Sequence, residues 1–580
     1  MTRNGLIAVL LAAVALTGGA TPVAAQTTEA HIQELIRAAA ERIGAGQIAS
    51  GDPLQTPAQG SGAVVRLSLD DAVKLALDRN LDIAVQRLNP QTFDFSIAAL
   101  QANYKPALTS QLATNSVLNP PTNTLQGVPG GEKGITNSTT TGNGGITQNL
   151  RWGGGGYALT LNNNRQTTNS TTSTLNPAFN TTYSAQYTQP LMRGFKIDNT
   201  RQSLVVTKIN QEISETQLQA SIINTLSNVR NAYWDYVYAI QAVGVARESL
   251  DLATKLVQDN QTRVEVGTMA PIDVVQAQSE QATRRQTLVQ AEATRRTTEL
   301  ALKRLIVGGT QDSNWDASID PTDRPEFRPE PIDVAAVVRR ALSARTDLTI
   351  AHKNLESNDV TVKLLRNQLL PQTDFVARYG FVGRGGTQIT RSGTGLGAGQ
   401  SVITNTIPGG FGDAFNTMFH NDYPTWNVTL NFSYPLGTST AEANLARARI
   451  QESQVQAQLK QIELQVATDV TNAAIQAQTT AEAVQAAQAA RELAQKKLEA
   501  EQSKFEVGMS TNYFVVQAQR DLRDAQNSEL RAVLNYRKAL VELERLQQTT
   551  LSNLNITVIN AGGGGVTTGG SGRTTTTSGG

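Results

Sequence analysis

Apolar residues recur at alternating spacings of four and three along two unusually long stretches of the chain. In the first stretch, from about 197 to 266, the recurring residues are Ile222, Leu226, Val229, Tyr233, Tyr236, Ile240 and Val243. In the second, from about 441 to 507, they are Val466, Val470, Ala473, Ala477, Thr480 and Val484. This heptad spacing is typical of long helices that pack side by side. Each stretch predicts a helix of about 70 residues, roughly 100 Å long.

Shorter helical patterns accompany each long one. The segment "LSLDDAVKLALDRNLDI" opens a helix at about residue 67, which we expect Pro90 to kink and Pro106 to end. A similar pattern begins at 332 and ends at Pro371. Together with the helix that follows each long one, these short helices add up to the length of the long helix. We therefore expect each short pair to lie end to end along a long helix.

The two long helices end in nearly the same sequence. Residues 265–278 read "EVGTMAPIDVVQAQ" and residues 506–519 read "EVGMSTNYFVVQAQ". A helix from 272 to about 306 follows the first turn, and another to about 548 follows the second. The duplicated turns are therefore expected at the same end of a rod, in two copies of one helix–strand–helix unit.

Polar and apolar residues alternate in the segments between the helices. In "TWNVTLNFSYPL", Trp426, Val428, Leu430 and Phe432 share one face, while Asn427, Thr429 and Asn431 share the other. Strands of about 10 residues cross an outer-membrane-type bilayer when tilted, although the sheet of a soluble protein shows the same alternation. The pattern predicts at least four strands per chain, and a hairpin through "RWGGGGYALT" would make six.

Four strands cannot enclose a channel, because a barrel of about eight leaves room only for side chains. Two copies would give about 8 strands and a filled barrel, whereas three would give about 12 and a pore. We therefore expect three copies if the protein conducts anything.

The N-terminus has the pattern of a secretory signal. Arg3 precedes an apolar run from Leu6 to Leu16, which is too short for the roughly 20 residues of a spanning helix. The predicted organisation is a signal peptide (1–25), a periplasmic segment and linker (26–66), a first repeat (67–310), a linker (311–331), a second repeat (332–549) and a disordered Gly/Thr-rich tail (550–580). Two long polar loops are predicted at about 117–145 and 383–424.

Composition argues against several functions. The 50 Lys+Arg and 49 Asp+Glu are balanced, so nothing indicates nucleic acid as a partner. Cysteine is absent, and His31, His352 and His420 have no second ligand at metal spacing, so neither a metal site nor a cofactor is predicted. No residues suggest catalysis, so we do not expect an enzyme. The basic "TRRQ" after residue 282 is interpreted as a solvated helix face.

The order of "LSLDDAVKLALDRNLDI", "YTQPLMRGF" and the two EVG turns resembles the TolC-like outer-membrane efflux protein family over nearly the whole mature chain. The resemblance implies an α+β membrane protein, in which a trimeric transmembrane β-barrel continues into a long periplasmic α-helical barrel. It implies a location in the cell outer membrane and the periplasm. It also implies a passive export duct of a tripartite efflux or type I secretion system, which docks onto a periplasmic adaptor and an inner-membrane transporter.

The resemblance also assigns candidate sites to the turns. Those expected at the adaptor contact are Val266, Gly267, Thr268, Val507, Gly508 and Met509. The alternative is that both turns are only helix stops. Asp273 falls where the family places acidic rings at the periplasmic aperture, whereas the second half has Phe514 and Gln517 there. Three copies of Phe514 would close the aperture by dewetting an apolar neck. The alternative is that Phe514 packs between helices.

Trp152, Trp426 and Tyr434 are predicted to form a belt against outer-membrane lipid.

A secreted structural or adhesive coiled-coil protein is the main alternative function, and it would have rods without barrel strands. A periplasmic enzyme on a helical scaffold would need a convergent polar site, which the sequence does not show. The cargo is left open among drugs, metals, a secreted protein and a polysaccharide.

Overall fold

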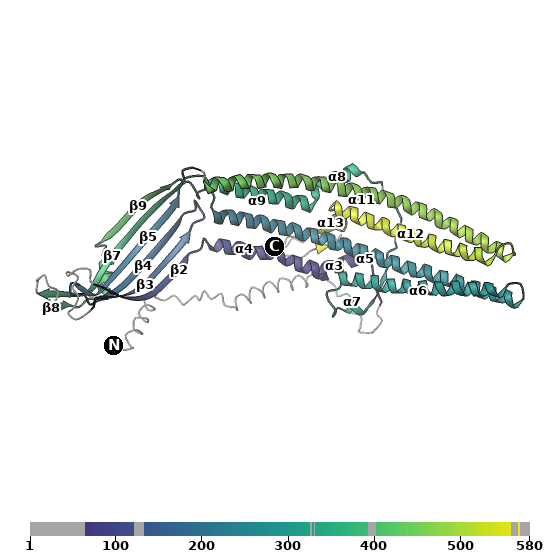
Figure 1. The fold of residues 1–580 in the computed structure, drawn as a ribbon, viewed down its shortest axis with the longest axis horizontal. Helices are drawn as coiled ribbons and strands as arrows, with labels where there is room; N and C mark the ends of the chain where they lie inside the picture. The colour runs from purple at the N-terminus through teal and green to yellow at the C-terminus, as the bar shows by residue number, and fades with distance from the viewer. Residues whose placement is uncertain are drawn as a thin grey trace, which may run out of the picture.

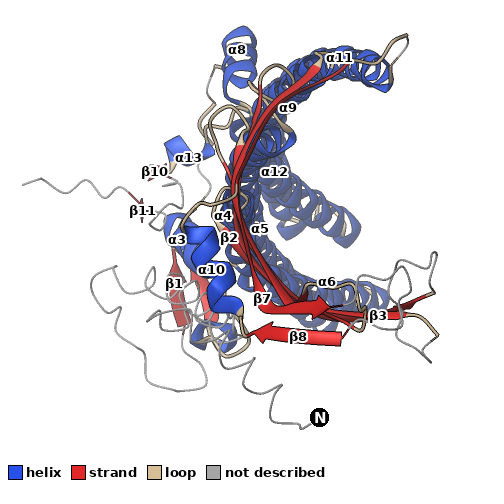
Figure 2. Ribbon diagram, turned by 90° about the vertical axis from the view of Figure 1, so that its left-hand side faces the viewer, coloured by secondary structure: helices blue, strands red, loops and turns tan. Residues whose placement is uncertain are grey.

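The computed structural model describes residues 64–120, 133–324, 327–329, 331–392, 402–437, 439–557 and 567–568. A curved β-sheet lies at one end, and long helices extend from it (Figure 1). Seen along the long axis, sheet and helices follow one arc (Figure 2). The predicted signal peptide lies outside the described residues.

Two long helices, α5 (Asn199–Glu265) and α11 (Thr440–Glu506), run the length of the helical part, and each has 67 residues. Asp198 caps α5 by accepting a hydrogen bond from the backbone N–H of Arg201, and Ser439 caps α11 in a capping box with Glu442. The predicted heptad positions of both helices are buried or half-buried, so the predicted seams are confirmed. No described helix is long and apolar enough to span a membrane.

The shorter helices lie end to end along the long ones, as predicted (Figure 1). Along α5 lie α3 (Leu69–Arg79), α4 (Leu81–Ala102) and α6 (Pro271–Ile306). Along α11 lie α8 (Val334–Ala344), α9 (Thr346–Gln368) and α12 (Asn512–Leu546). Because α9 and α12 also contact α5, the α5 helix lies in the middle of the arc.

The first helical pattern breaks at Asn80, between α3 and α4, and the sequence analysis did not predict this break. The Asn80 side chain accepts hydrogen bonds from the backbone N–H groups of Asp82 and Ile83, at 3.0 and 3.1 Å, and so caps α4. Its amide also donates to the carbonyl of Leu305, at 2.9 Å. Pro90 lies inside α4, which continues to Ala102 because it packs along α5.

One antiparallel sheet contains most of the described strands. Its members are β2 (Ala107–Asn119), β3 (Ile135–Asn149), β4 (Gly156–Thr168), β5 (Leu175–Pro190), β7 (Gln372–Ser392), β8 (Val402–Ile407) and β9 (Pro424–Ser433). The order is β2-β3-β4-β5-β7, after which β9 pairs with the part of β7 near the helices and β8 with its far end. The predicted glycine-turn hairpin is therefore present as β3 and β4.

The structure describes part of each predicted polar loop, and that part contains strands; residues 121–132 and 393–401 lie outside the described residues. The range 117–145 contains the end of β2 and most of β3, and 383–424 contains part of β7, β8 and the helix α10 (Phe411–Phe419). Hydroxyl groups bond across the strands there, for example Ser138 to Ser116, 2.7 Å apart. The segments looked like loops because polar residues occupy both faces, which removes the alternation that marks a strand.

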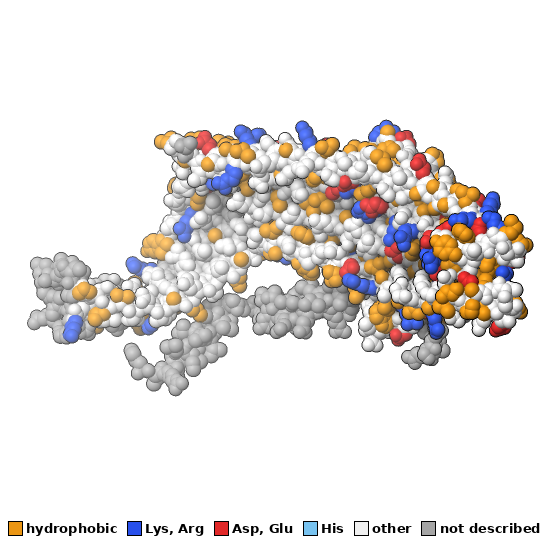
Figure 3. All heavy atoms as spheres, turned by 45° about the vertical axis from the view of Figure 1, so that its right-hand side comes forward, with side chains coloured by type: hydrophobic (Ala, Val, Ile, Leu, Met, Phe, Trp, Pro, Cys, Tyr) orange, Lys and Arg blue, Asp and Glu red, His pale blue; other side chains and the backbone are white. Residues whose placement is uncertain are grey.

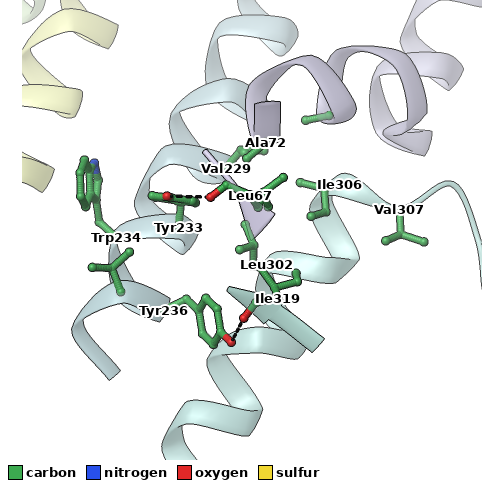
Figure 4. Packing of buried hydrophobic residues seen from close by; sticks show 12 residues of the cluster. Leu67, Ala72, Val229, Tyr233, Trp234, Tyr236, Leu302, Ile306, Val307 and Ile319 are labelled. Atoms are coloured by element: carbon green, nitrogen blue, oxygen red, sulfur yellow. Dashed lines mark hydrogen bonds between the residues drawn. The ribbon is translucent and has the colours of Figure 1, made fainter. Parts of the chain in front are cut away.

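The predicted linkers contribute a small, partly buried strand pair. The strand β1 (Val64–Leu67) pairs in parallel with β6 (Ser318–Pro321), which follows the short helix α7 (Ser313–Asp316). Tyr233 donates a hydrogen bond to the Leu67 carbonyl at 3.1 Å, and Tyr236 donates to the Ile319 carbonyl at 2.6 Å (Figure 4). Burial raises the pKa of Tyr236 to about 12. The aromatic part of the α5 seam thus holds this strand pair against the helices.

The ordered chain also continues past residue 549. The helix α13 (Thr550–Asn553) and the strands β10 (Ile556–Thr557) and β11 (Thr567–Thr568) lie within the range predicted as a tail. Leu551 and Ile556 are buried against Leu218 and Ile222 of α5. The tail was placed too early because its glycine-rich composition begins only after these apolar residues.

Candidate functional site

The sheet has one strongly polar face. A single row across it consists of Thr109, Gly145, Thr160, Ser184, Gly380 and Thr425. Side chains on this face bond to one another: Thr160 and Ser184 are 2.7 Å apart, and Arg378 donates to Ser184 at 3.2 Å. A surface of hydroxyl, amide and guanidinium groups suits contact with water.

The opposite face of the sheet is apolar. The neighbouring row consists of Leu108, Ile146, Leu159, Ala185, Tyr379 and Trp426. Leu108 is 81% exposed and Trp426 is 75% exposed, so described protein covers little of this row. An uncovered apolar face opposite a polar one is the pattern of a strand set that separates lipid from an aqueous interior.

The three predicted belt residues do not all lie at one level of the sheet. Trp152 lies in the turn between β3 and β4, at the helix end, where its ring meets Phe195 edge-on with 5.8 Å between centroids. Tyr434 directly follows β9 at the same end, and both side chains are exposed. Trp426 lies in the middle of the apolar face, opposite Tyr379. Only Trp152 and Tyr434 therefore lie at one rim.

The two EVG turns have the same geometry. Gly267 and Gly508 have φ values of 74° and 78°, which glycine adopts without a steric cost. The following N–H groups close the motif, since Thr268 donates to Arg263 and Met509 donates to Lys504, both at 2.8 Å. This bond from the second residue after the cap to the third residue before it is the Schellman helix ending.

The turns lie together at the end of the molecule away from the sheet (Figure 1). Asn260 of α5 donates a hydrogen bond to Asn512 of α12 at 3.0 Å, and Asn512 donates to the carbonyl of Asp273 at 3.4 Å. The guanidinium of Arg263 lies over the Phe505 ring, 4.3 Å from its centroid. These contacts confirm that both turns are at the same end.

Large apolar side chains are exposed at this end, among Lys and Arg (Figure 3). Val266, Val507 and Met509 are 68%, 70% and 79% exposed. Exposed apolar residues gathered at one tip are typical of a surface that contacts another protein.

The predicted aperture residues follow the turns directly. Asp273 lies in the first turn of α6 and is half-buried. Phe514 is 53% exposed, and its ring meets that of Tyr513 edge-on at 5.6 Å. Gln517 donates a hydrogen bond to Asp521 on its own helix at 2.8 Å. Within the described chain, Phe514 is therefore not packed into the interior.

A buried ion cluster lies behind the tips, which the sequence interpretation missed. Glu280 of α6 is 5% exposed and forms ion pairs with Arg284 of α6 and Arg520 of α12. Arg284 belongs to the "TRRQ" segment, so the prediction of a solvated face is wrong for this residue. The signal available in the sequence was a Glu four residues before an Arg, which places both on one side of a helix.

Comparisons with known proteins agree with this architecture. A family model described as outer membrane efflux protein matches residues 157–308 and 337–547. No sequence among curated proteins matches the chain.

Several solved outer-membrane channels share the fold. The CmeC outer membrane channel of Campylobacter jejuni is 14% identical with a TM-score of 0.56, over 83% of this chain and 85% of that one. VceC of Vibrio cholerae is 14% identical with a TM-score of 0.57, over 83% and 95% of the two chains. The MtrE outer membrane channel of Neisseria gonorrhoeae is 15% identical with a TM-score of 0.55, over 86% and 95%.

The comparisons do not support the alternative of a secreted coiled-coil protein, and the matched family is one of transport channels and not a class of enzymes. The fold of helices continued by an antiparallel sheet is that of outer-membrane channel structures. Since the family model covers more than half of the residues, the chain belongs to the outer membrane efflux protein family.

Proposed function

We propose that three copies of this chain close into one passive duct, the outer-membrane channel of a tripartite efflux or type I secretion system. The single observation that carries the proposal is an apolar stripe on α11 that no described residue covers. Ile450, Leu464, Ile475 and Leu493 are each more than half exposed and are separated by nearly whole numbers of helical turns. The stripe is roughly 65 Å long and lies opposite the buried seam of the same helix.

The other edge of the arc offers a matching surface. Exposed apolar residues on α4 are Leu81, Val85, Leu88 and Phe95, and those on α6 are Ile272, Val275, Val289 and Leu300. Inside the chain, α5 packs against α9 and α12, which lie end to end. We infer that α11 of one copy packs against α4 and α6 of the next copy in the same way.

The sheet edges support the same closure. Among the described strands, β2 and β9 are each paired on one side only, and both are exposed along their length. Since open edges are rare in membranes, β9 of one copy would pair with β2 of the next. Three copies of β2, β3, β4, β5, β7 and β9 would supply about 18 strands, enough for an aqueous channel. The polar face would line the lumen.

The finer assignments form part of the proposal. Residues 67–310 and 332–549 are two repeats after a signal peptide at 1–25, and the helices form a periplasmic barrel. The exposed tips at Val266, Gly267, Thr268, Val507, Gly508 and Met509 dock onto a periplasmic adaptor that serves an inner-membrane transporter. Trp152 and Tyr434 face lipid at the rim near the helices.

Near the tips, three copies of Asp273, Phe514 and Gln517 line the aperture. The exposure of Phe514 in the single chain leaves it free to meet its copies at the threefold axis. Phe514→Ala is then expected to raise single-channel conductance and antibiotic leakage. Unchanged values would refute the gate and leave the duct intact.

The duct is tested by imaging the purified protein and recording conductance in planar bilayers. A threefold hollow cylinder with discrete conductance steps is expected. A compact monomer without conductance would refute the proposal.

Docking is tested separately with a photo-crosslinker on a single introduced cysteine, since the chain has no other. Val507→Cys should capture the adaptor in intact cells. The matched control is Leu436→Cys, which is 95% exposed but lies where the sheet meets the helices. Equal capture by both variants would contradict docking at the tips.

A further inference from the structure

The helix α10 lies flat against the apolar face of the sheet, near the end away from the long helices. It contacts β7 and β5, and it lies on the convex side of the arc (Figure 2). Two glycines of β7 make room for it. A Cβ at Gly383 would overlap the carbonyl oxygen of Ala414, and one at Gly385 would lie 2.6 Å from the Ala414 nitrogen. The contact is therefore close and specific.

The buried side of α10 is small and apolar. Ala414 is fully buried, and Met418 is 4% exposed. Beneath the helix, Thr181 of β5 is fully buried, although it lies in the same row as Gly383 on the face that is otherwise open. The helix thus covers a patch of the surface that the proposed barrel presents to lipid.

A row of phenylalanines runs along the flank of α10 next to this buried side. Phe411, Phe415 and Phe419 are one turn apart, with ring centroids separated by 6.1 and 6.2 Å. Phe411 also meets Phe179 of β5 at 4.6 Å, whereas Phe419 is 78% exposed. The one acidic residue of the helix, Asp413, accepts a hydrogen bond from the Gly410 N–H at its N-terminus.

The level of α10 on the sheet indicates what covers these rings. Toward the helices, this face holds residues such as Phe381 and Tyr379. In the row of Gly385 and Phe179, it changes to Arg165, Thr140 and Thr114. The helix therefore lies where an apolar band gives way to a polar surface, the level at which amphipathic helices and aromatic residues meet a membrane interface.

We propose that α10 is an interfacial helix, which inserts Phe411, Phe415 and Phe419 among the acyl chains of the outer leaflet. This proposal rests on the proposed barrel. A neighbouring copy does not fit as the occupant, because copies would join edge to edge at β2 and β9, whereas α10 packs on the face of the sheet over β5 and β7. The helix would provide an aromatic anchor at the outer rim, opposite Trp152 and Tyr434 at the inner rim.

The test uses spin labels on single cysteines in the full protein, reconstituted in phosphatidylcholine vesicles. Accessibility to oxygen, which concentrates in lipid, is compared with accessibility to a water-soluble nickel complex. The label at Phe419→Cys should favour oxygen and report a shallow depth. A label at Leu430→Cys, on the apolar face, should lie deeper, and labels at Asn416→Cys on α10 and Asn431→Cys on the polar face should favour nickel.

Two results would overturn the proposal. A Phe419 label as accessible to nickel as the Asn416 label would mean that α10 lies in water. A Phe419 label inaccessible to both reagents would mean that protein covers the row. If the Leu430 label also favoured nickel, the barrel itself would fail together with the anchor. A water-exposed Phe419 beside a lipid-exposed Leu430 would refute the anchor alone.

Discussion

The two long helices α5 and α11 have the same length, similar caps and the same ending, yet they differ in what surrounds them. The α5 helix contacts α3, α4, α6, α9 and α12, whereas among the described helices α11 contacts α8, α9 and α12. Far more residues are buried on α5 than on α11. One helix is thus enclosed within the chain, and the other is enclosed on one side only.

The difference extends to side-chain size. Counting back from the two turns, Tyr233 and Tyr236 of α5 correspond to Ala474 and Ala477 of α11, and all four are fully buried. The tyrosines reach the β1–β6 strand pair, for which the second half has no described counterpart. Small residues on α11 instead allow α12 to approach closely. A shared helix register therefore supports two different kinds of packing.

The largest expected difference is between a substitution on the buried side of α11 and one on its exposed side. Val470→Asp places a charge in a fully buried position and should destabilise the fold by about 4 kcal/mol or more. Leu464→Asp, on the exposed stripe, should leave the helical circular dichroism intact but separate the copies. Thermal melts and light scattering of the detergent-purified variants measure the two effects. A Leu464→Asp protein that remained trimeric would remove the stripe from the interface.

The next effect compares corresponding positions of α5 and α11. Tyr236→Ala should cost roughly 3–5 kcal/mol, because it leaves a cavity and an unpaired Ile319 carbonyl. Ala477→Gly should cost only about 1 kcal/mol, the difference in helix propensity. Urea unfolding followed by circular dichroism measures both. Equal costs would show that the strand pair adds nothing to the α5 seam.

Equivalent substitutions in the two EVG turns should destabilise the fold equally, whereas those at corresponding positions of α5 and α11 should not. Gly267→Ala and Gly508→Ala each force a non-glycine residue into a left-handed conformation, at about 1–2 kcal/mol. Neither position has an atom within 4 Å of the added Cβ, so strain of the backbone is the only expected cost. Parallel unfolding curves of the two variants provide the check. A clear difference between them would contradict the equal backbone strain expected from the matching φ values of the two turns.

The last effect is absent at neutral pH and appears only in alkaline solution. The pKa of Tyr236 is raised from 10.0 to about 12 by burial, so folding favours the neutral phenol. Its contribution to stability is complete below pH 10 and decreases as the pH rises from 10 to 12. The melting temperature of the natural chain should therefore fall more steeply over this window than that of Tyr236→Phe. Identical slopes would mean that the phenol titrates as it does in water.

The sequence alone was sufficient for features that repeat locally. The heptad spacing of Val229, Tyr233 and Tyr236 predicted a buried seam, and the glycine after each EV pair predicted a helix end. Both features depend on residues that are close together in the sequence. The break at Asn80 was missed because Pro90 is the stronger local signal, although packing of α4 along α5 preserves the helix there.

The candidate sites also divide into those that the sequence indicated and those that depend on packing between distant segments. The tips were predicted from matched motifs, and Trp152, Trp426 and Tyr434 were predicted as belt residues because they are aromatic residues in the strand segments. The pairing of the buried Glu280 with Arg520 could not be predicted, since the two residues lie on helices far apart in sequence. Trp426 lies away from the rim because of the register in which β9 pairs with β7. The alternation of polar and apolar residues along β9 does not determine that register.

By itself, the sequence determined the lengths of the two long helices, their seams, the paired turns and the two faces of β9, because each follows from periodic contacts within one element. Only the tertiary structure decided that α5 is enclosed while α11 keeps a free stripe, and that α10 packs over β5 and β7 on the apolar face of the sheet. Burial is a property of neighbours brought together from distant parts of the chain, and a local pattern of apolar residues does not specify which neighbours those are.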